Sequence, residues 1–138
     1  MKAELDAALV RDFPLLYGNR HAPMQASCMC WGFECGDGWE PLIRELSAKI
    51  ETIIAAMPVE EQPNFRASQV KEKFGTLRFY MSMGNDAIWA AIDEADAKSA
   101  VTCEDCGKPG SVRGGGWIKV QCDACHGGSD VLDPADLP

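Results

Sequence analysis

Two Cys-x-x-Cys pairs near the C-terminal end of the chain constrain its fold more than any other feature. Cys103 and Cys106 form the first pair, and fifteen residues later Cys122 and Cys125 form the second. Each pair makes a tight turn that directs two thiolates toward one point, and this spacing is typical of a tetrahedral zinc site. The sequence therefore predicts that these four cysteines bind Zn2+.

The residues around the two pairs predict a zinc ribbon over 101–126. Gly107 follows the first pair, where a left-handed backbone is useful and glycine adopts it without strain. The residues between the pairs can form a hairpin, with strands over 111–113 and 117–120 and a turn of three glycines. We expect Trp117 to seal this ribbon. His126 adjoins Cys125 and could replace it as a ligand, although four thiolates are the simpler set.

Apolar residues at helical spacing predict three helices, and alternating apolar residues predict one β-hairpin. Leu42, Leu46 and Ile50 belong to the clearest amphipathic stripe of the chain. In the hairpin, Leu77 and Phe79 alternate with polar residues. The expected bounds are about 2–13, 40–57 and 86–100 for the helices and about 66–83 for the hairpin.

The 138 residues correspond to about one domain. We predict an α+β domain over 1–100, in which helices pack on a small antiparallel sheet. The helix over 86–100 runs almost directly into Cys103, so the four-cysteine zinc ribbon should be docked on this domain rather than tethered by a linker. Residues 127–138 are rich in glycine, proline and aspartate and predict a disordered tail.

The stretch between His21 and Trp39 holds three more cysteines and leaves several interpretations open. His21, Cys28, Cys30 and Cys35 could form a second metal site, although their spacing matches no common zinc knuckle. A buried loop, bent by its glycines, in which the thiols pack as small apolar groups is the alternative. A redox role for Cys28 and Cys30, or an enzymatic site in this loop, is a further hypothesis.

The charge of the chain favours some partners over others. Its net charge is −8, and it lacks the broad basic face of a general nucleic-acid binder. One short basic segment lies in the hairpin, where a turn at 74–75 would place Lys71 opposite Arg78. We predict a partner-binding face formed by Lys71, Lys73, Arg78 and Tyr80. The alternative is that these cations pair with acidic helices of the same protein.

Several function classes have no support in the sequence. No apolar run approaches the roughly 20 residues that span a bilayer, and the acidic start does not read as a signal peptide. We therefore expect a cytoplasmic protein without membrane contact, in which paired cysteines stay reduced and bind metal. The motifs of zinc deaminases, phosphate-binding loops and zincins are absent from the sequence. We therefore predict a protein that is not an enzyme.

Two further motifs, taken with the ribbon and its Gly116-Trp117 pair, carry a resemblance. They are Cys30-Trp31-Gly32-Phe33-Glu34-Cys35-Gly36-Asp37-Gly38-Trp39 and Gln69-Val70-Lys71-Glu72-Lys73-Phe74-Gly75-Thr76-Leu77-Arg78-Phe79-Tyr80. With these motifs the chain resembles small proteins encoded by bacteriophages and prophages, over nearly all of its length before the tail.

The resemblance implies a phage or prophage gene whose product works in the cytoplasm of a bacterial host cell. Small acidic phage proteins often bind host proteins, and some inhibit host defence complexes, as anti-CRISPR proteins do. The expected function is therefore a non-enzymatic protein-binding module with structural zinc and a host protein as partner. A nucleic-acid-binding accessory protein that uses the ribbon and the basic hairpin face is the alternative.

Overall fold

The computed structural model describes residues 1–114 and 116–127. Its helices are α1 (Ala3–Asp12), α2 (Glu40–Ala55), α3 (Asp86–Ser99) and α4 (Asp123–His126). Its strands are β1 (Phe33–Glu34), β2 (Ala67–Lys73), β3 (Thr76–Met81), β4 (Ser111–Arg113) and β5 (Lys119–Gln121). The tail predicted over 127–138 lies outside the described residues, apart from Gly127.

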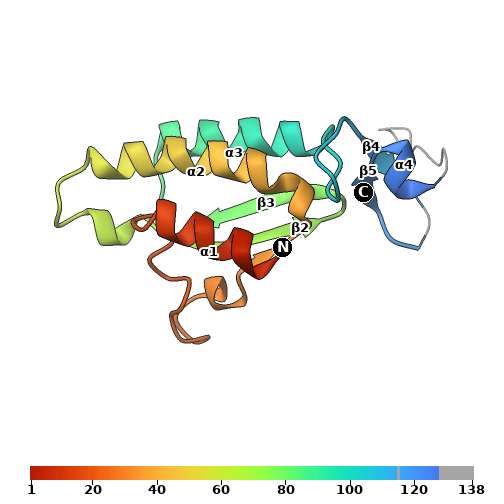
Figure 1. The fold of residues 1–138 in the computed structure, drawn as a ribbon. Helices are drawn as coiled ribbons and strands as arrows, with labels where there is room; N and C mark the ends of the chain where they lie inside the picture. The colour runs from red at the N-terminus through yellow and green to blue at the C-terminus, as the bar shows by residue number, and fades with distance from the viewer. Residues whose placement is uncertain (115, 128–138) are drawn as a thin grey trace.

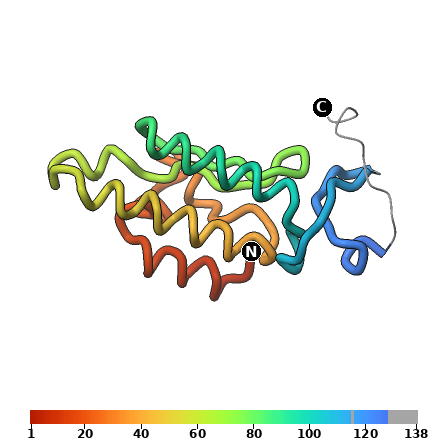
Figure 2. Tube along the Cα trace, turned by 90° about the horizontal axis from the view of Figure 1, so that it is seen from above, coloured from red at the N-terminus to blue at the C-terminus, as the bar shows by residue number. Residues whose placement is uncertain are grey.

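The α+β class is confirmed, with the ribbon at one end of the molecule. Figure 1 shows α2 and α3 running side by side over the β2–β3 hairpin, with β4, β5 and α4 beyond their ends. The view from above in Figure 2 places α1 beside α2 and the hairpin on the side of α3. Pro41 occupies the first turn of α2, where a missing N–H is tolerated. Asn85 caps α3, because its side-chain oxygen accepts the N–H of Ile88 at 2.9 Å.

The main sheet is mixed, which corrects the expected antiparallel sheet. Its strand order is β1-β2-β3, and β1 pairs with β2 in parallel, with Phe33 opposite Val70. Parallel neighbours need a long crossover, and here α2 provides it between β1 and β2. Strand β1 was not predicted from the sequence, because it is only two residues long and lies in a glycine-rich stretch without a periodic pattern.

The core lies between the sheet and the helices, with Tyr17 at its centre. The ring of Tyr17 makes edge contacts with Phe33, at 5.0 Å between centroids, and with Phe79, at 6.5 Å. Its hydroxyl group is hydrogen-bonded to the hydroxyl of Ser47 on α2, and burial raises the pKa of Tyr17. The carboxylate of Glu51 on α2 accepts hydrogen bonds from the backbone N–H groups of Leu15 and Leu16, which directly precede Tyr17. This segment is therefore held by both polar and apolar contacts.

The turn between β2 and β3 carries backbone strain. Phe74 and Gly75 have φ angles of 53° and 91°, and Lys73 pairs with Thr76 across them. Two positive φ values define the hairpin turn that normally takes Asn-Gly, because a left-handed backbone is unfavourable for a bulky residue. The predicted register is confirmed, since Lys71 lies opposite Arg78.

We expect Phe74→Asn to stabilise the protein by about 1 kcal/mol, since asparagine tolerates the left-handed region in which Phe74 is held. Urea unfolding of the zinc-loaded protein would measure the change. Phe74→Ala is the matched control, because alanine removes the ring but keeps the unfavourable φ. A Phe74→Asn protein no more stable than Phe74→Ala would show that backbone strain at this position is negligible.

The ribbon is joined to the α+β domain by three hydrogen bonds from the segment 36–39. The N–H of Gly38 donates to the carbonyl oxygen of Glu104 at 2.7 Å, and the N–H of Gly36 donates to the Glu104 carboxylate at 2.7 Å. The indole N–H of Trp39 donates to the carbonyl oxygen of Thr102 at 2.9 Å. A Cβ atom at Gly38 would lie 2.3 Å from the Cys103 carbonyl oxygen, so only glycine allows this approach.

Trp39, rather than Trp117, seals the joint between the ribbon and the domain. Trp39 is fully buried, whereas 73% of the Trp117 surface is exposed. The expectation that Trp117 would fill this place was therefore wrong. Among the described residues, no helix is both long enough and apolar enough to cross a membrane.

Candidate metal centre

The four predicted ligands converge within the ribbon. The Sγ atoms of Cys103, Cys106, Cys122 and Cys125 all lie within 4.8 Å of one another. Zn–S bonds of about 2.3 Å in a tetrahedron place the sulfur atoms about 3.8 Å apart. The Cys106 and Cys122 sulfur atoms are separated by 3.6 Å. The four cysteines could therefore hold a metal ion, and their thiolates fit zinc.

Backbone hydrogen bonds shape each of the two knuckles. In the first, the N–H of Gly107 donates to the Cys103 carbonyl at 2.9 Å, and Gly107 takes the predicted left-handed conformation with a φ of 82°. In the second, the N–H of Cys125 donates to the Cys122 sulfur at 3.4 Å. That N–H, together with the neighbouring thiols of the cluster, lowers the pKa of the Cys122 thiol to about 7. The hydrogen bond therefore favours the thiolate that a metal requires.

Ion pairs and a short hairpin hold the second knuckle close to the first. Strands β4 and β5 pair in antiparallel register, with Val112 opposite Val120. The buried guanidinium of Arg113 on β4 donates to the carboxylate of Asp123 at 2.7 Å. Lys119 on β5 donates to Asp105, between the first two cysteines, at 2.6 Å. Each strand therefore anchors one of the two knuckles.

Four thiolates complete the coordination of a zinc ion and leave no position for a catalytic water. His126 lies outside the sulfur cluster, with its Nδ1 atom 3.2 Å from the Gln121 side-chain oxygen. The donor set is therefore that of a structural zinc site, in which the metal contributes to folding.

The other cysteines do not form a second cluster of this kind. Within the part of the chain that the structure describes, the ribbon cysteines are the only group of three or more potential metal ligands. Cys28 is exposed, whereas Cys35 is buried, and burial raises the pKa of the Cys35 thiol to about 12. Cys35 thus stays protonated and packs as a small apolar residue, as the buried-loop interpretation expects, whereas the exposed Cys28 does not fit that interpretation.

The residues expected to bind a partner lie on the hairpin, but they do not form a continuous set of free charges. Arg78 forms an ion pair with Asp96 of α3 at 3.7 Å and donates to the Thr76 hydroxyl at 2.7 Å. The Lys73 ammonium lies 5.7 Å from the centre of the Phe74 ring. Lys71 is half-buried, and 41% of the Tyr80 surface is exposed. The cations are thus partly matched within the protein itself, at Arg78 above all.

Sequence reasoning missed a pocket between the hairpin turn and the ribbon. The pocket has a volume of about 330 Å³, and it is lined by Glu72, Lys73, Phe74, Gly116, Trp117 and Ile118. An aromatic residue where a two-residue turn normally has asparagine, and a tryptophan in a glycine-rich loop, were the signals available in the sequence. The chain matches no protein-family model, no curated protein and no solved structure.

Proposed function

We propose that this protein is a non-enzymatic protein-binding module whose zinc ion is structural. The observation that carries the proposal is the closed set of four thiolates, in a ribbon that three hydrogen bonds join to the α+β domain. A metal without an open position acts through the structure it maintains. Here the metal would fix the ribbon against the hairpin turn and so maintain the exposed surface between them.

The charge of the chain supports a protein partner over a nucleic acid. The net charge of −8 opposes binding to phosphates, and Arg78, the cation in the centre of the hairpin, is paired with Asp96. A partner with a basic surface complements such a chain and would associate faster because of long-range attraction.

The proposal includes a phage or prophage origin for the gene and a host protein as the binding partner. The motifs at 30–39 and 69–80 resemble phage and prophage proteins, which supports a gene of that origin and a host protein as the target. Inhibition of a host defence complex in the bacterial cytoplasm is the specific role we propose. The acidic charge supports this role in general terms, since it suits a basic host surface.

The test is the reconstitution of a complex from two purified proteins. Tagged protein from bacterial cells would be analysed by native mass spectrometry, and any co-purifying protein would be expressed separately and titrated against the zinc-loaded chain. The expected result is one zinc ion per chain and a saturable complex that survives moderate salt. Failure to reconstitute a complex with any co-purifying protein would contradict the proposal.

A parallel titration with DNA and RNA distinguishes the protein-binding function from the alternative, a nucleic-acid-binding function. Binding of DNA or RNA whose affinity falls steeply between about 50 and 200 mM salt would favour the nucleic-acid-binding accessory protein. Loss of that binding on Lys71→Ala would assign it to the hairpin face.

A further inference from the structure

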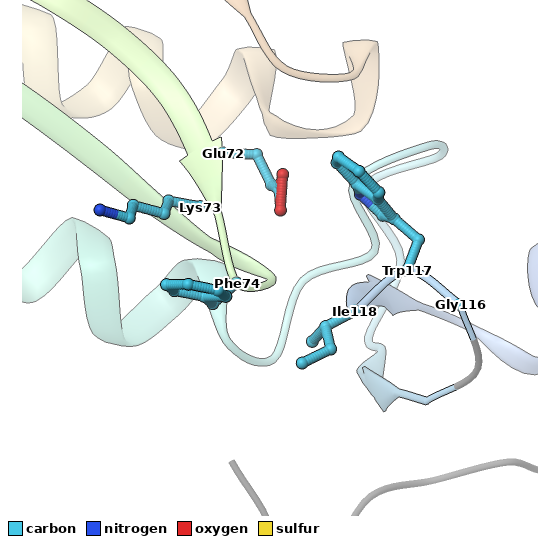
Figure 3. A pocket seen from close by; sticks show the side chains of 6 residues that line it. All are labelled: Glu72, Lys73, Phe74, Gly116, Trp117 and Ile118. Atoms are coloured by element: carbon cyan, nitrogen blue, oxygen red, sulfur yellow. The ribbon is translucent and has the colours of Figure 1, made fainter. Parts of the chain in front are cut away.

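The pocket between the hairpin turn and the ribbon combines apolar walls with one carboxylate. Figure 3 shows Phe74 and Ile118 on one side, Trp117 on another, and the Glu72 side chain extending toward Trp117. Lys73 extends away from Trp117, so its ammonium lies outside the space between the aromatic rings. The apolar walls come from two segments that are more than forty positions apart in the sequence.

Phe74 contributes to this pocket although its backbone conformation is unfavourable. Its φ is 53°, and 53% of its surface is exposed, so burial in the core does not offset the strain. Strained backbone that persists without a packing reason is a feature of binding sites. Gly75 beside it packs against the ribbon, where an added Cβ would lie 3.2 Å from the Ile118 side chain. The turn is therefore held against the ribbon with the Phe74 ring directed outward.

Glu72 supplies a charge that pairs with no cation among the described residues. One carboxylate oxygen accepts the N–H of Gly75 at 3.1 Å. Glu72 takes part in none of the ion pairs formed among the described residues, and Lys119 of β5 is already paired with Asp105. A half-buried carboxylate beside two exposed aromatic rings can accept a cation.

We propose that this pocket binds an arginine side chain presented by an exposed segment of a partner protein. The methylene stem of arginine suits the walls of Phe74 and Ile118, and its planar guanidinium suits the exposed face of Trp117. The remaining oxygen of Glu72 would accept a hydrogen bond from the guanidinium. A volume of about 330 Å³ is at the small end of ligand pockets and is adequate for one long side chain.

The partner chemistry agrees with the charge of the whole chain. With a net charge of −8, the protein attracts basic surfaces over distances of about 10 Å at ordinary salt. The assignment rests on the proposed protein-binding function and specifies which residue type of the partner is recognised.

The experiment uses the zinc-loaded chain and three short peptides that differ at one position. Acetyl-Gly-Gly-Arg-Gly-Gly-amide is titrated while the indole N–H signals are followed by NMR, and the signal lost in Trp117→Ala identifies Trp117. The matched peptides carry citrulline, which keeps the shape but not the charge, or leucine. The arginine peptide should shift the Trp117 signal saturably with a millimolar Kd, at least about fivefold tighter than the citrulline peptide.

Two variants locate the effect, and a third is the control. Glu72→Gln should reduce arginine binding to the level of the citrulline peptide, and Trp117→Ala should abolish binding as followed by the backbone signals. Trp31→Ala, which changes an exposed tryptophan in another part of the chain, should leave binding unchanged. Equal binding of the leucine or citrulline peptide would overturn the proposal, as would the absence of any shift. NMR shifts that change with protein concentration and not with peptide concentration would also overturn the proposal, because they would show that a second copy of the chain occupies the pocket.

The two proposals fail in different ways. If a host-protein complex forms but is insensitive to Trp117→Ala and Glu72→Gln, the assignment of the pocket is wrong and the proposed function stands. If the arginine peptide binds but no protein partner can be reconstituted, the proposed function fails while the pocket remains an arginine site.

Discussion

Replacing Cys106 by serine is expected to release zinc from the protein and to unfold the ribbon. The Cys106 sulfur lies 3.6 Å from that of Cys122 in a cluster of four cysteines that could hold one metal ion. Removing a residue that only hydrogen-bonds to a metal ligand typically lowers metal affinity 10- to 100-fold. Removing a ligand itself should therefore lower zinc affinity by more than about 100-fold. Zinc competition with a chelator of known affinity would measure the change.

Cys28→Ser is the matched control for this prediction, because Cys28 is also exposed but lies outside the cluster. It should retain one zinc ion per chain with unchanged affinity. Hydrogen exchange adds a structural readout: in Cys106→Ser the amide of Gly38 should exchange faster, while that of Ile50 in α2 stays protected. A Cys106→Ser protein with affinity within tenfold of the parent would show that Cys106 is not a ligand.

Trp39→Ala should lower the free energy of unfolding by about 3–5 kcal/mol, the range for truncation of a fully buried aromatic side chain. Trp39 is completely buried and donates its indole N–H to Thr102 across the joint with the ribbon. The substitution would therefore remove core packing and leave the carbonyl oxygen of Thr102 without its donor. Denaturant unfolding at fixed zinc concentration would measure the loss.

Trp31→Ala serves as the control, since 62% of the Trp31 surface is exposed and the change should be within about 0.5 kcal/mol. Trp39→Ala should still bind one zinc ion, because the ribbon itself carries all four thiolates. The two largest predictions thus separate metal binding from docking. A loss below about 1 kcal/mol for Trp39→Ala would mean that Trp39 does not hold the ribbon against the domain.

The elements with a strong local pattern could be predicted from the sequence. The stripe that contains Leu46 and Ile50 gave α2, and the alternation around Phe79 gave the hairpin together with its register. The cysteine spacing predicted which four sulfur atoms would meet, because two knuckles can place four thiolates in few other ways. In each case, local geometry determines the result.

The features that depend on distant contacts could not be predicted in this way. Strand β1 is two residues long, and its pairing with β2 is visible only when α2 is folded between them. The choice between Trp39 and Trp117 as the buried residue depends on where the ribbon docks, and both follow a glycine. The pocket is formed by residues of two separate hairpins, and neither hairpin alone contains it.

The joint between segment 36–39 and the first knuckle has a consequence for how the protein is made. The hydrogen-bonding partners are more than sixty positions apart, so the ribosome releases Gly36 and Gly38 long before Glu104. There is thus a stage of synthesis at which the residues of α2 and of the β2–β3 hairpin have been made while these N–H groups still lack their acceptors. The joint can therefore close only after residues 102–104, which supply those acceptors, have been synthesised.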